Sequence, residues 1–217
     1  MSELVKITID DREIEARAGE KLLWTALEND IYIPHLCAIK DEKRSNASCR
    51  LCFVEIEGVD HPVTACTRKV EEGMVVKTRS PHLDRLVKTG FELLLSDHDL
   101  KCAKCAANKS CALQTIAKER GLKLRQKRFK LIERDYKIDD SPAEFAYNRS
   151  RCVLCGQCVW ADREEAKVGA IGFTQRGVNR AVTTFEDIPL ADSICTECHL
   201  CVDACPVGAL YYKSDLK

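Results

Sequence analysis

Hydrophobic and polar residues alternate along the first eighteen positions of the chain. Apolar side chains occupy every second position on both sides of Asp10-Asp11: Val5, Ile7 and Ile9 before it, and Ile14, Ala16 and Ala18 after it. A period of two is typical of strands with one buried face, and the two acidic residues suit a turn. The pattern therefore predicts a β-hairpin over residues 4–18.

One helix and three further strands are predicted before residue 79. Apolar residues with helical spacing follow Gly19: Leu22, Leu23, Ala26 and Leu27. Pro34 excludes further helix before Cys37. Strand patterns return at 52–56, 63–67 and 74–78. A small mixed sheet with one helix across it is the natural packing for residues 1–78.

Two helices and a charged connector come next. Ser80-Pro81 is a good helix start, and one apolar face runs from Leu83 towards His98. A second helix is predicted over residues 111–120. The segment KERGLKLRQKRFK, residues 118–130, is strongly basic and is followed by the acidic IERDYKIDD. We interpret it as a solvated connector, with docking of a partner as the alternative.

Composition makes cysteine the central question. The chain has 217 residues, of which fourteen are cysteine and only thirteen are aromatic. A hydrophobic core with so few aromatic residues needs cross-links, such as disulfides or bound metal, to be stable. We find no secretory signal after the N-terminal MSELVKITID and no apolar run of membrane-spanning length, so we expect a cytoplasmic protein with reduced thiols. Cysteine clusters then indicate metal ligands first, with disulfides as the alternative. Equal numbers of acidic and basic residues, thirty-four each, argue against nucleic acid or an anionic membrane as partner.

The first two ligand sets do not decide between an iron–sulfur cluster and zinc. Cys37, Cys49, Cys52 and Cys66 keep the inner C-x2-C pair and distant fourth cysteine of plant-type 2Fe–2S proteins, although the first gap is longer. Four-thiolate zinc is the competitor. The second set has three thiolates and an imidazole, which suit a 4Fe–4S cluster or a structural zinc: His98, Cys102, Cys105 and Cys111.

Two cysteine triplets within residues 148–212 indicate iron–sulfur clusters. They form an internal duplication and match the bacterial ferredoxin run C-x2-C-x2-C-x3-C-P: Cys152, Cys155 and Cys158, then Cys195, Cys198 and Cys201 with Cys205-Pro206. In that run the fourth cysteine ligates the other cluster, so Cys205 completes the first triplet. Asp162 stands at the corresponding position for the second triplet. Sixteen ligands then make four sets of four, with no cysteine left over.

Asp162 leaves the last cluster with more than one predicted state. A carboxylate is a harder donor than a thiolate, so we expect a labile corner. We expect a 4Fe–4S cluster with Asp162 or water as fourth ligand, which loses an iron to give 3Fe–4S in air. The alternative is that Asp162 turns to solvent and pairs with Arg163 or Lys167. His199 lies between Cys198 and Cys201, in a spacer position that we expect to point away from the cluster.

Nearly the whole chain resembles a known group of proteins. It resembles the N-terminal iron–sulfur region of the large peripheral-arm subunit of complex I, the matching region of iron-only hydrogenases and the diaphorase small subunit of NAD-linked nickel–iron hydrogenases. The four ligand sets carry this resemblance, together with CVLCGQC, VGAIGF and CPVGAL. It implies an α+β protein with a β-grasp 2Fe–2S domain (1–78), a His/Cys3 4Fe–4S segment (79–120), a linker (121–147) and a two-cluster ferredoxin-like domain (148–217).

The resemblance also implies a function. It predicts an electron-transfer subunit between a flavin/NAD(P) subunit and a hydrogenase-type catalytic subunit, with a further ferredoxin-like subunit as another candidate partner. A formate dehydrogenase, a bifurcating complex and a complex I-type assembly are alternatives. The chain stops at Lys217 without a hydrogen-activating domain, so we expect no catalysis of its own. It has no G-x-G-x-x-G fingerprint, so FMN and NAD should bind a partner. The distant alternatives are a zinc-ribbon interaction protein and a self-contained reductase.

Overall fold

The computed structural model describes residues 3–125, 127–132, 134 and 136–216. The outer ends of the predicted terminal domains (Met1, Ser2 and Lys217) and three positions of the predicted linker (Gln126, Glu133 and Asp135) lie outside the described residues. The chain forms two compact units, residues 1–93 with 119–122 and residues 94–118 with 123–217. Within the described part, no helix has the length and apolar composition needed to cross a membrane.

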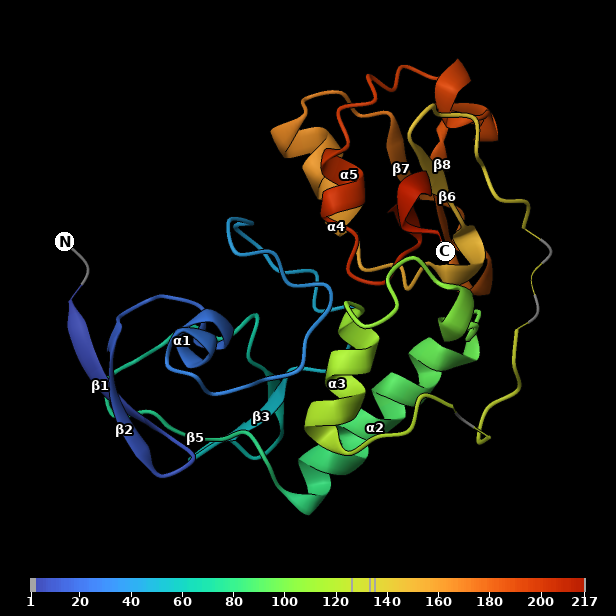
Figure 1. The fold of residues 1–217 in the computed structure, drawn as a ribbon. Coiled ribbons are helices and arrows are strands. Elements are labelled where there is room, and N and C mark those ends of the chain that lie inside the picture. The colour runs from blue at the N-terminus through green and yellow to red at the C-terminus, as the bar shows by residue number, and fades with distance from the viewer. Residues whose placement is uncertain (1–2, 126, 133, 135, 217) are drawn as a thin grey trace. The chain divides into compact units, whose positions relative to one another are not determined.

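The elements confirm a mixed α and β architecture (Figure 1). The first unit begins with the strands of a sheet and helix α1: β1 (Leu4–Ile9), β2 (Arg12–Arg17), α1 (Leu22–Glu28), β3 (Phe53–Ile56), β4 (Val63–Thr64) and β5 (Val75–Lys77). Two helices follow: α2 (Pro81–Ser96) and α3 (Ala112–Arg120). The second unit adds short elements: β6 (Phe145–Tyr147), α4 (Gln157–Trp160), β7 (Ile171–Thr174), β8 (Ala181–Thr184), α5 (Leu200–Asp203) and β9 (Leu210–Tyr212).

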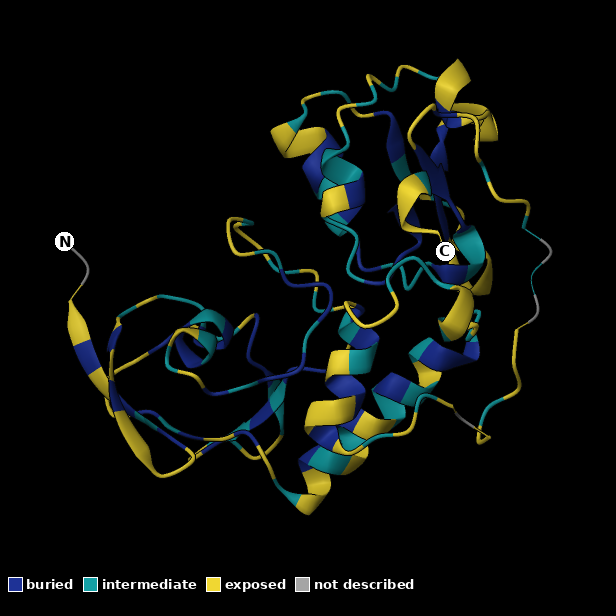
Figure 2. Cartoon of the chain, in the orientation of Figure 1, coloured by how far each residue is buried: buried dark blue, intermediate teal, exposed yellow. Residues whose placement is uncertain are grey.

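The first unit is a five-stranded sheet in the order β2-β1-β5-β3-β4. The predicted hairpin is confirmed, with Ile7 opposite Ile14, and β1 pairs in parallel with β5. Alternate residues of both hairpin strands are buried, as the period of two predicted (Figure 2). Strand β4 is shorter than the predicted 63–67, because Thr67 turns back and its N–H and hydroxyl both donate to the Thr64 carbonyl. That turn carries Cys66.

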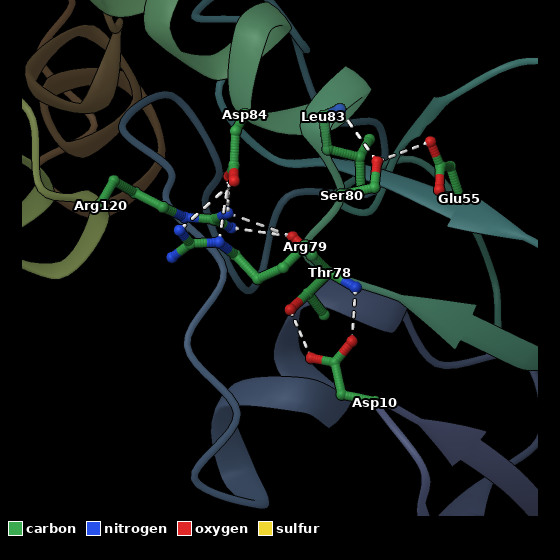
Figure 3. A network of polar contacts seen from close by, with 8 residues as sticks. All are labelled: Asp10, Glu55, Thr78, Arg79, Ser80, Leu83, Asp84 and Arg120. Carbon is green, nitrogen blue, oxygen red and sulfur yellow. Dashed lines mark hydrogen bonds and ion pairs between the residues drawn. The ribbon is translucent and has the colours of Figure 1, made fainter.

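Helix α2 begins where the sequence predicted. The Ser80 hydroxyl accepts a hydrogen bond from the Leu83 N–H at 3.1 Å and donates to the Glu55 carboxylate at 2.9 Å (Figure 3). A serine cap satisfies one of the otherwise unpaired N–H groups at the helix start. The cap therefore anchors the helix to β3, and Leu83, Val87, Phe91 and Leu95 of the apolar stripe are buried.

A buried arginine joins the end of α3 to the sheet. The Arg120 guanidinium donates to the Thr78 carbonyl at 3.1 and 3.2 Å and pairs with Asp84 at 3.3 Å (Figure 3). Thr78 in turn donates its N–H to Asp10 at 2.7 Å. A buried charge needs such partners, so this network gives the last turn of α3 a defined place beside the end of β5.

The second unit repeats one backbone plan twice. In each triplet the second residue after the first cysteine has a positive φ, 54° at Leu154 and 52° at Glu197. Two residues later φ is positive again, 83° at Gly156 and 65° at His199, and a four-residue helix follows. Antiparallel pairs β6–β9 and β7–β8 complete the unit. These matched turns agree with the internal duplication that the triplets predicted.

Candidate metal centres

The first ligand set lies in the sheet unit and is almost fully buried. The exposed fraction is 1% for Cys37, 6% for Cys49, 1% for Cys52 and 0% for Cys66. The Cys49 N–H donates to the Cys37 sulfur at 3.4 Å. A hydrogen bond from Cys49 lowers the pKa of Cys37 to about 5, while its bond to Cys37 and burial raise the pKa of Cys49. The bond between Cys52 and Cys66 likewise lowers the pKa of Cys66, and that bond together with burial raises the pKa of Cys52, so the four thiols lie close together in two pairs.

The backbone of helix α2 lies very close to the loop that carries Cys49 and Cys52. Arg50, between two of the cysteines, has a positive φ of 53°. Its carbonyl oxygen lies only 2.8 Å from the point that a Cβ on Gly90 would occupy. Glycine is needed there because the helix backbone and the cysteine loop approach so closely.

The second set gathers around the end of α2 and the start of α3. Cys102 begins a 3₁₀ turn, Cys102–Lys104, and Cys111 immediately precedes α3. Burial raises the pKa of Cys111, and the charges of Cys105 and Cys102 raise it further. The three thiols are therefore close enough to influence one another's ionisation.

His98 has the environment that a metal ligand requires. Burial lowers the pKa of the imidazole, so the neutral form is favoured. Its Nδ1 is buried without a hydrogen-bond partner, and the ring also bonds to the Arg151 backbone. Because Nδ1 is unpaired, that bond belongs to Nε2, whose N–H donates to the Arg151 carbonyl. Metal-binding histidines typically donate their other ring N–H in this way. The buried Nδ1 thus fits a ligand to iron.

Cys205 lies close to the first triplet. Burial raises the pKa of Cys152 to about 11, and the Cys205 charge adds to the rise. The pKa of Cys158 is raised by burial and then by Cys152, Cys155 and Cys205, with a smaller effect from Cys201. Backbone N–H groups of Leu154 and Leu210 donate to the sulfurs of Cys152 and Cys205, both at 3.4 Å.

The second triplet is more open than the first. Cys198 is exposed, and Cys195 and Cys201 are partly buried. The Glu197 N–H donates to the Cys195 sulfur at 3.4 Å, which repeats the bond at Cys152. Burial raises the pKa of Cys201 to about 12, followed by the charges of Cys195, Cys198 and Asp162. Asp162 is therefore close to this triplet.

Asp162 is buried, so the alternative in which it turns to solvent is wrong. Its exposed fraction is 7%, and it lies in a π-helical turn, Ala161–Glu165, that continues α4. One carboxylate oxygen accepts the Ile171 N–H at 3.1 Å. Burial raises the pKa of Asp162, and backbone hydrogen bonds from Ile171 and its neighbours oppose that rise. Lys167 instead pairs with Glu164 at 3.4 Å. π-Turns inside α-helices are rare and frequent at functional sites.

Two residues near the clusters were not predicted from the sequence. Gly208 has a φ of +69°, and a Cβ on it would lie 2.7 Å from that of Ala107 and 3.2 Å from the Cys105 sulfur. The CPVGAL segment could have indicated it, because glycine after Cys-Pro marks a tight turn. Arg151 is 6% exposed although it carries a charge. No local pattern reveals its burial, which depends on contacts distant in sequence.

His199 is packed by aromatic rings. Its imidazole makes edge contacts with Phe145 and Tyr212, with centroids 5.7 and 5.5 Å away. Its Nε2 lies 3.4 Å from a Glu144 oxygen. These neighbours agree with a spacer residue that faces the surrounding protein.

The donor sets have the chemistry of iron–sulfur sites. Soft thiolates select zinc or iron–sulfur clusters, and backbone N–H···S bonds accompany cluster-binding cysteines. Among the described residues, no three His, Cys, Asp or Glu side chains are arranged to hold a single metal ion. In a cubane cluster each ligand binds a different iron, so its ligands lie further apart than those of one ion. Donor types, N–H···S bonds and the unpaired His98 nitrogen all fit such clusters.

Three iron–sulfur families match the chain in succession. Residues 2–81 match the 2Fe-2S iron-sulfur cluster binding domain, and residues 88–125 match the NADH-ubiquinone oxidoreductase-G iron-sulfur binding region. Residues 144–211 match the ferredoxin-like domain of NADH-quinone oxidoreductase subunit 3. The α+β fold with three successive iron–sulfur regions, predicted from the sequence, is thereby confirmed.

Individual relatives come from several oxidoreductases. The chain is 35% identical over 211 residues to the NADP-reducing hydrogenase subunit HndD of Solidesulfovibrio fructosivorans, covering 95% of this chain and 36% of that protein. It is 37% identical over 210 residues to the NADPH-Fe(3+) oxidoreductase subunit alpha of Geobacter sulfurreducens, covering 97% and 24%. The chain thus spans about a quarter to a third of the length of these relatives.

A solved structure matches over nearly its full length. A chain of the NAD+-reducing [NiFe]-hydrogenase, crystallised in the H2-reduced state, superposes with a TM-score of 0.85 at 28% identity. The match covers 97% of the present chain and 88% of that chain. The predicted resemblance to complex I and hydrogenase subunits is confirmed, and the chain is an iron–sulfur region homologous to subunits of oxidoreductase complexes.

Proposed function

We propose that this chain is an electron relay in a multi-subunit oxidoreductase. The placement of Cys205 beside Cys152 and Cys158, and of Asp162 beside Cys195 and Cys201, is the observation that carries the proposal. This proximity supports a crossed set of ligands of the kind found in two-cluster ferredoxins, with Asp162 in place of one cysteine. Iron–sulfur clusters, when bound, accept and release single electrons. The chain's residues hold them, bury them and set their charge environment.

The proposed ligands form four sets within the segments 1–78, 79–120 and 148–217, joined by the linker 121–147. The first set holds a 2Fe–2S cluster: Cys37, Cys49, Cys52 and Cys66. The other three sets each hold a 4Fe–4S cluster: His98, Cys102, Cys105 and Cys111; Cys152, Cys155, Cys158 and Cys205; Cys195, Cys198, Cys201 and Asp162. Oxidation of the last cluster gives 3Fe–4S. Buried thiols, N–H···S bonds and the unpaired His98 nitrogen support these assignments.

The partners belong to the proposal as well. We infer a cytoplasmic complex in which a flavin/NAD(P)-binding subunit and a hydrogenase-type catalytic subunit exchange electrons through this chain. The extensive match to a chain of an NAD+-reducing [NiFe]-hydrogenase supports that choice, because it covers 88% of that chain. The alternatives are the same relay in a formate dehydrogenase, a bifurcating complex or a complex I-type assembly.

Isolation of the native complex tests the proposal. The chain is tagged in its own host, purified without oxygen, and its co-purifying subunits are identified. We expect a flavin-containing subunit, and bleaching of the iron–sulfur absorption when hydrogen or NAD(P)H is added to the complex. The isolated chain should bleach with dithionite and not with NAD(P)H. Bleaching of the isolated chain by NAD(P)H, or colourless zinc-containing protein, would contradict the relay.

A further inference from the structure

Arg151 carries a buried positive charge that pairs with no carboxylate in the part of the chain that the structure describes. The residue is 6% exposed, and its Nε has no hydrogen-bond partner. Its Nη2 donates to the Lys104 carbonyl at 3.1 Å, and no ion pair joins it to a carboxylate of the described residues. The other buried arginine described above, Arg120, does have an acidic partner in Asp84. Buried charges are normally paired, and arginine stays protonated. Arg151 therefore has no counter-ion among the described residues.

The residue adjoins two of the proposed clusters. Its carbonyl accepts the His98 ring N–H, and its guanidinium bonds to Lys104, between Cys102 and Cys105. Both attachments belong to the second ligand set, and Cys152 of the third set is the next residue. A neighbouring backbone bond, Asp99 N–H to the Ser150 carbonyl at 2.8 Å, holds the same two segments together.

We propose that Arg151 is a positioning residue for the His98 cluster and supplies the positive charge that raises its reduction potential. The inference rests on the proposed function. A cluster with three thiolates is anionic, and reduction adds another negative charge, so a buried guanidinium favours the reduced state. The Arg151 carbonyl meanwhile bonds the His98 Nε2 and leaves Nδ1 for iron. The cluster is then the missing counter-ion, and the side chain and main chain of one residue serve the same site.

A matched set of variants separates charge from packing. Arg151→Gln removes the charge and keeps a hydrogen-bond donor, whereas Arg151→Lys keeps the charge. Lys101→Gln is the control, because Lys101 lies in the same loop with a side chain 71% exposed to solvent. Solvent screens an exposed charge, so the same change of one unit should have little effect there.

The reduction potential of the His98 cluster is the readout, followed by electron paramagnetic resonance of anaerobic protein in a redox titration. For Arg151→Gln we expect the ratio of reduced to oxidised cluster at a fixed potential to fall about tenfold, which for one electron equals about 59 mV. Arg151→Lys and Lys101→Gln should stay within about threefold of the wild type, or roughly half of that shift. An intact cluster with an unchanged potential in Arg151→Gln would overturn the proposal.

Two further outcomes also decide whether the proposed role of Arg151 is right. If Arg151→Gln fails to assemble, Arg151→Lys becomes the test: a potential near that of the wild type supports the charge role, and a tenfold fall contradicts it. If the wild type itself gives no 4Fe–4S signals, the proposed function and this inference fall together. Normal wild-type signals with no effect of Arg151 reject the inference alone.

Discussion

His98 is the one proposed ligand of its cluster that is not a thiolate. A neutral imidazole in place of an anionic thiolate makes the cluster less negative and favours its reduced state. We expect His98→Cys to lower the reduction potential of this cluster. Redox titration monitored by electron paramagnetic resonance measures the shift, with His82→Gln as control, because His82 lies on the exposed side of α2. The same potential in wild type and His98→Cys would count against ligation.

We expect Asp162 to make the last proposed cluster the most sensitive to oxygen. The carboxylate is buried beside Cys195 and Cys201 but is a poorer donor to iron than a thiolate. Mild oxidation of the wild type should therefore produce a 3Fe–4S signal in electron paramagnetic resonance.

Asp162→Cys completes the set with a thiolate and should abolish that signal. Glu164→Gln, on the exposed side of the same turn, should leave it unchanged. If the wild type gives no 3Fe–4S signal, and Asp162→Cys alters neither oxygen sensitivity nor potential, Asp162 has no special role.

At the scale of single residues, the sequence predicted the candidate ligands but not the residues that surround and position them. The spacing of Cys152, Cys155 and Cys158 is visible because three ligands lie within seven residues. Burial of Asp162 was one of two alternatives, and the structure decides between them. Arg151 could not be found, because its burial depends on Lys104, forty-seven positions away.

At the scale of elements, α2 and the first cysteine loop act together through Gly90. Alanine is the better helix former by about 1 kcal/mol, so Gly90→Ala would stabilise an isolated helix. Here its Cβ would meet the Arg50 carbonyl oxygen at 2.8 Å. Such overpacking costs about 1–3 kcal/mol. We expect a net loss of stability together with loss of the 2Fe–2S signal.

Thermal melting and visible circular dichroism measure the effect. Lys88→Ala is the control, because Lys88 is on the exposed side of the same helix. A Gly90→Ala protein that melts higher than the wild type and keeps its 2Fe–2S spectrum would contradict the close approach.

Element prediction succeeded where local patterns are strong. The hairpin of residues 4–18 and the serine-capped α2 follow from period and capping chemistry, and both are present. Strand β4 ends early because Thr67 bonds back to Thr64, a competition that strand propensity does not register. The π-turn at Asp162 was not predicted from the sequence.

At the scale of the whole molecule, we expect the proposed clusters to replace part of a hydrophobic core. The chain has few aromatic residues, and most of its fourteen cysteines lie at least partly buried. Metal binding then contributes free energy of folding. We expect Cys155→Ser to unfold residues around the two triplets while the sheet unit keeps its structure. Hydrogen exchange measures this, with Thr196→Ser in a spacer position as control. Unchanged exchange and melting in cluster-free Cys155→Ser protein would contradict the coupling.

The iron and sulfide content of anaerobically purified protein tests the central claim most directly. One 2Fe–2S and three 4Fe–4S clusters require roughly fourteen irons, with roughly as many sulfides, per chain. Zinc should be present only in traces. Fewer than half of these irons, or zinc in their place, would contradict a chain built around four clusters.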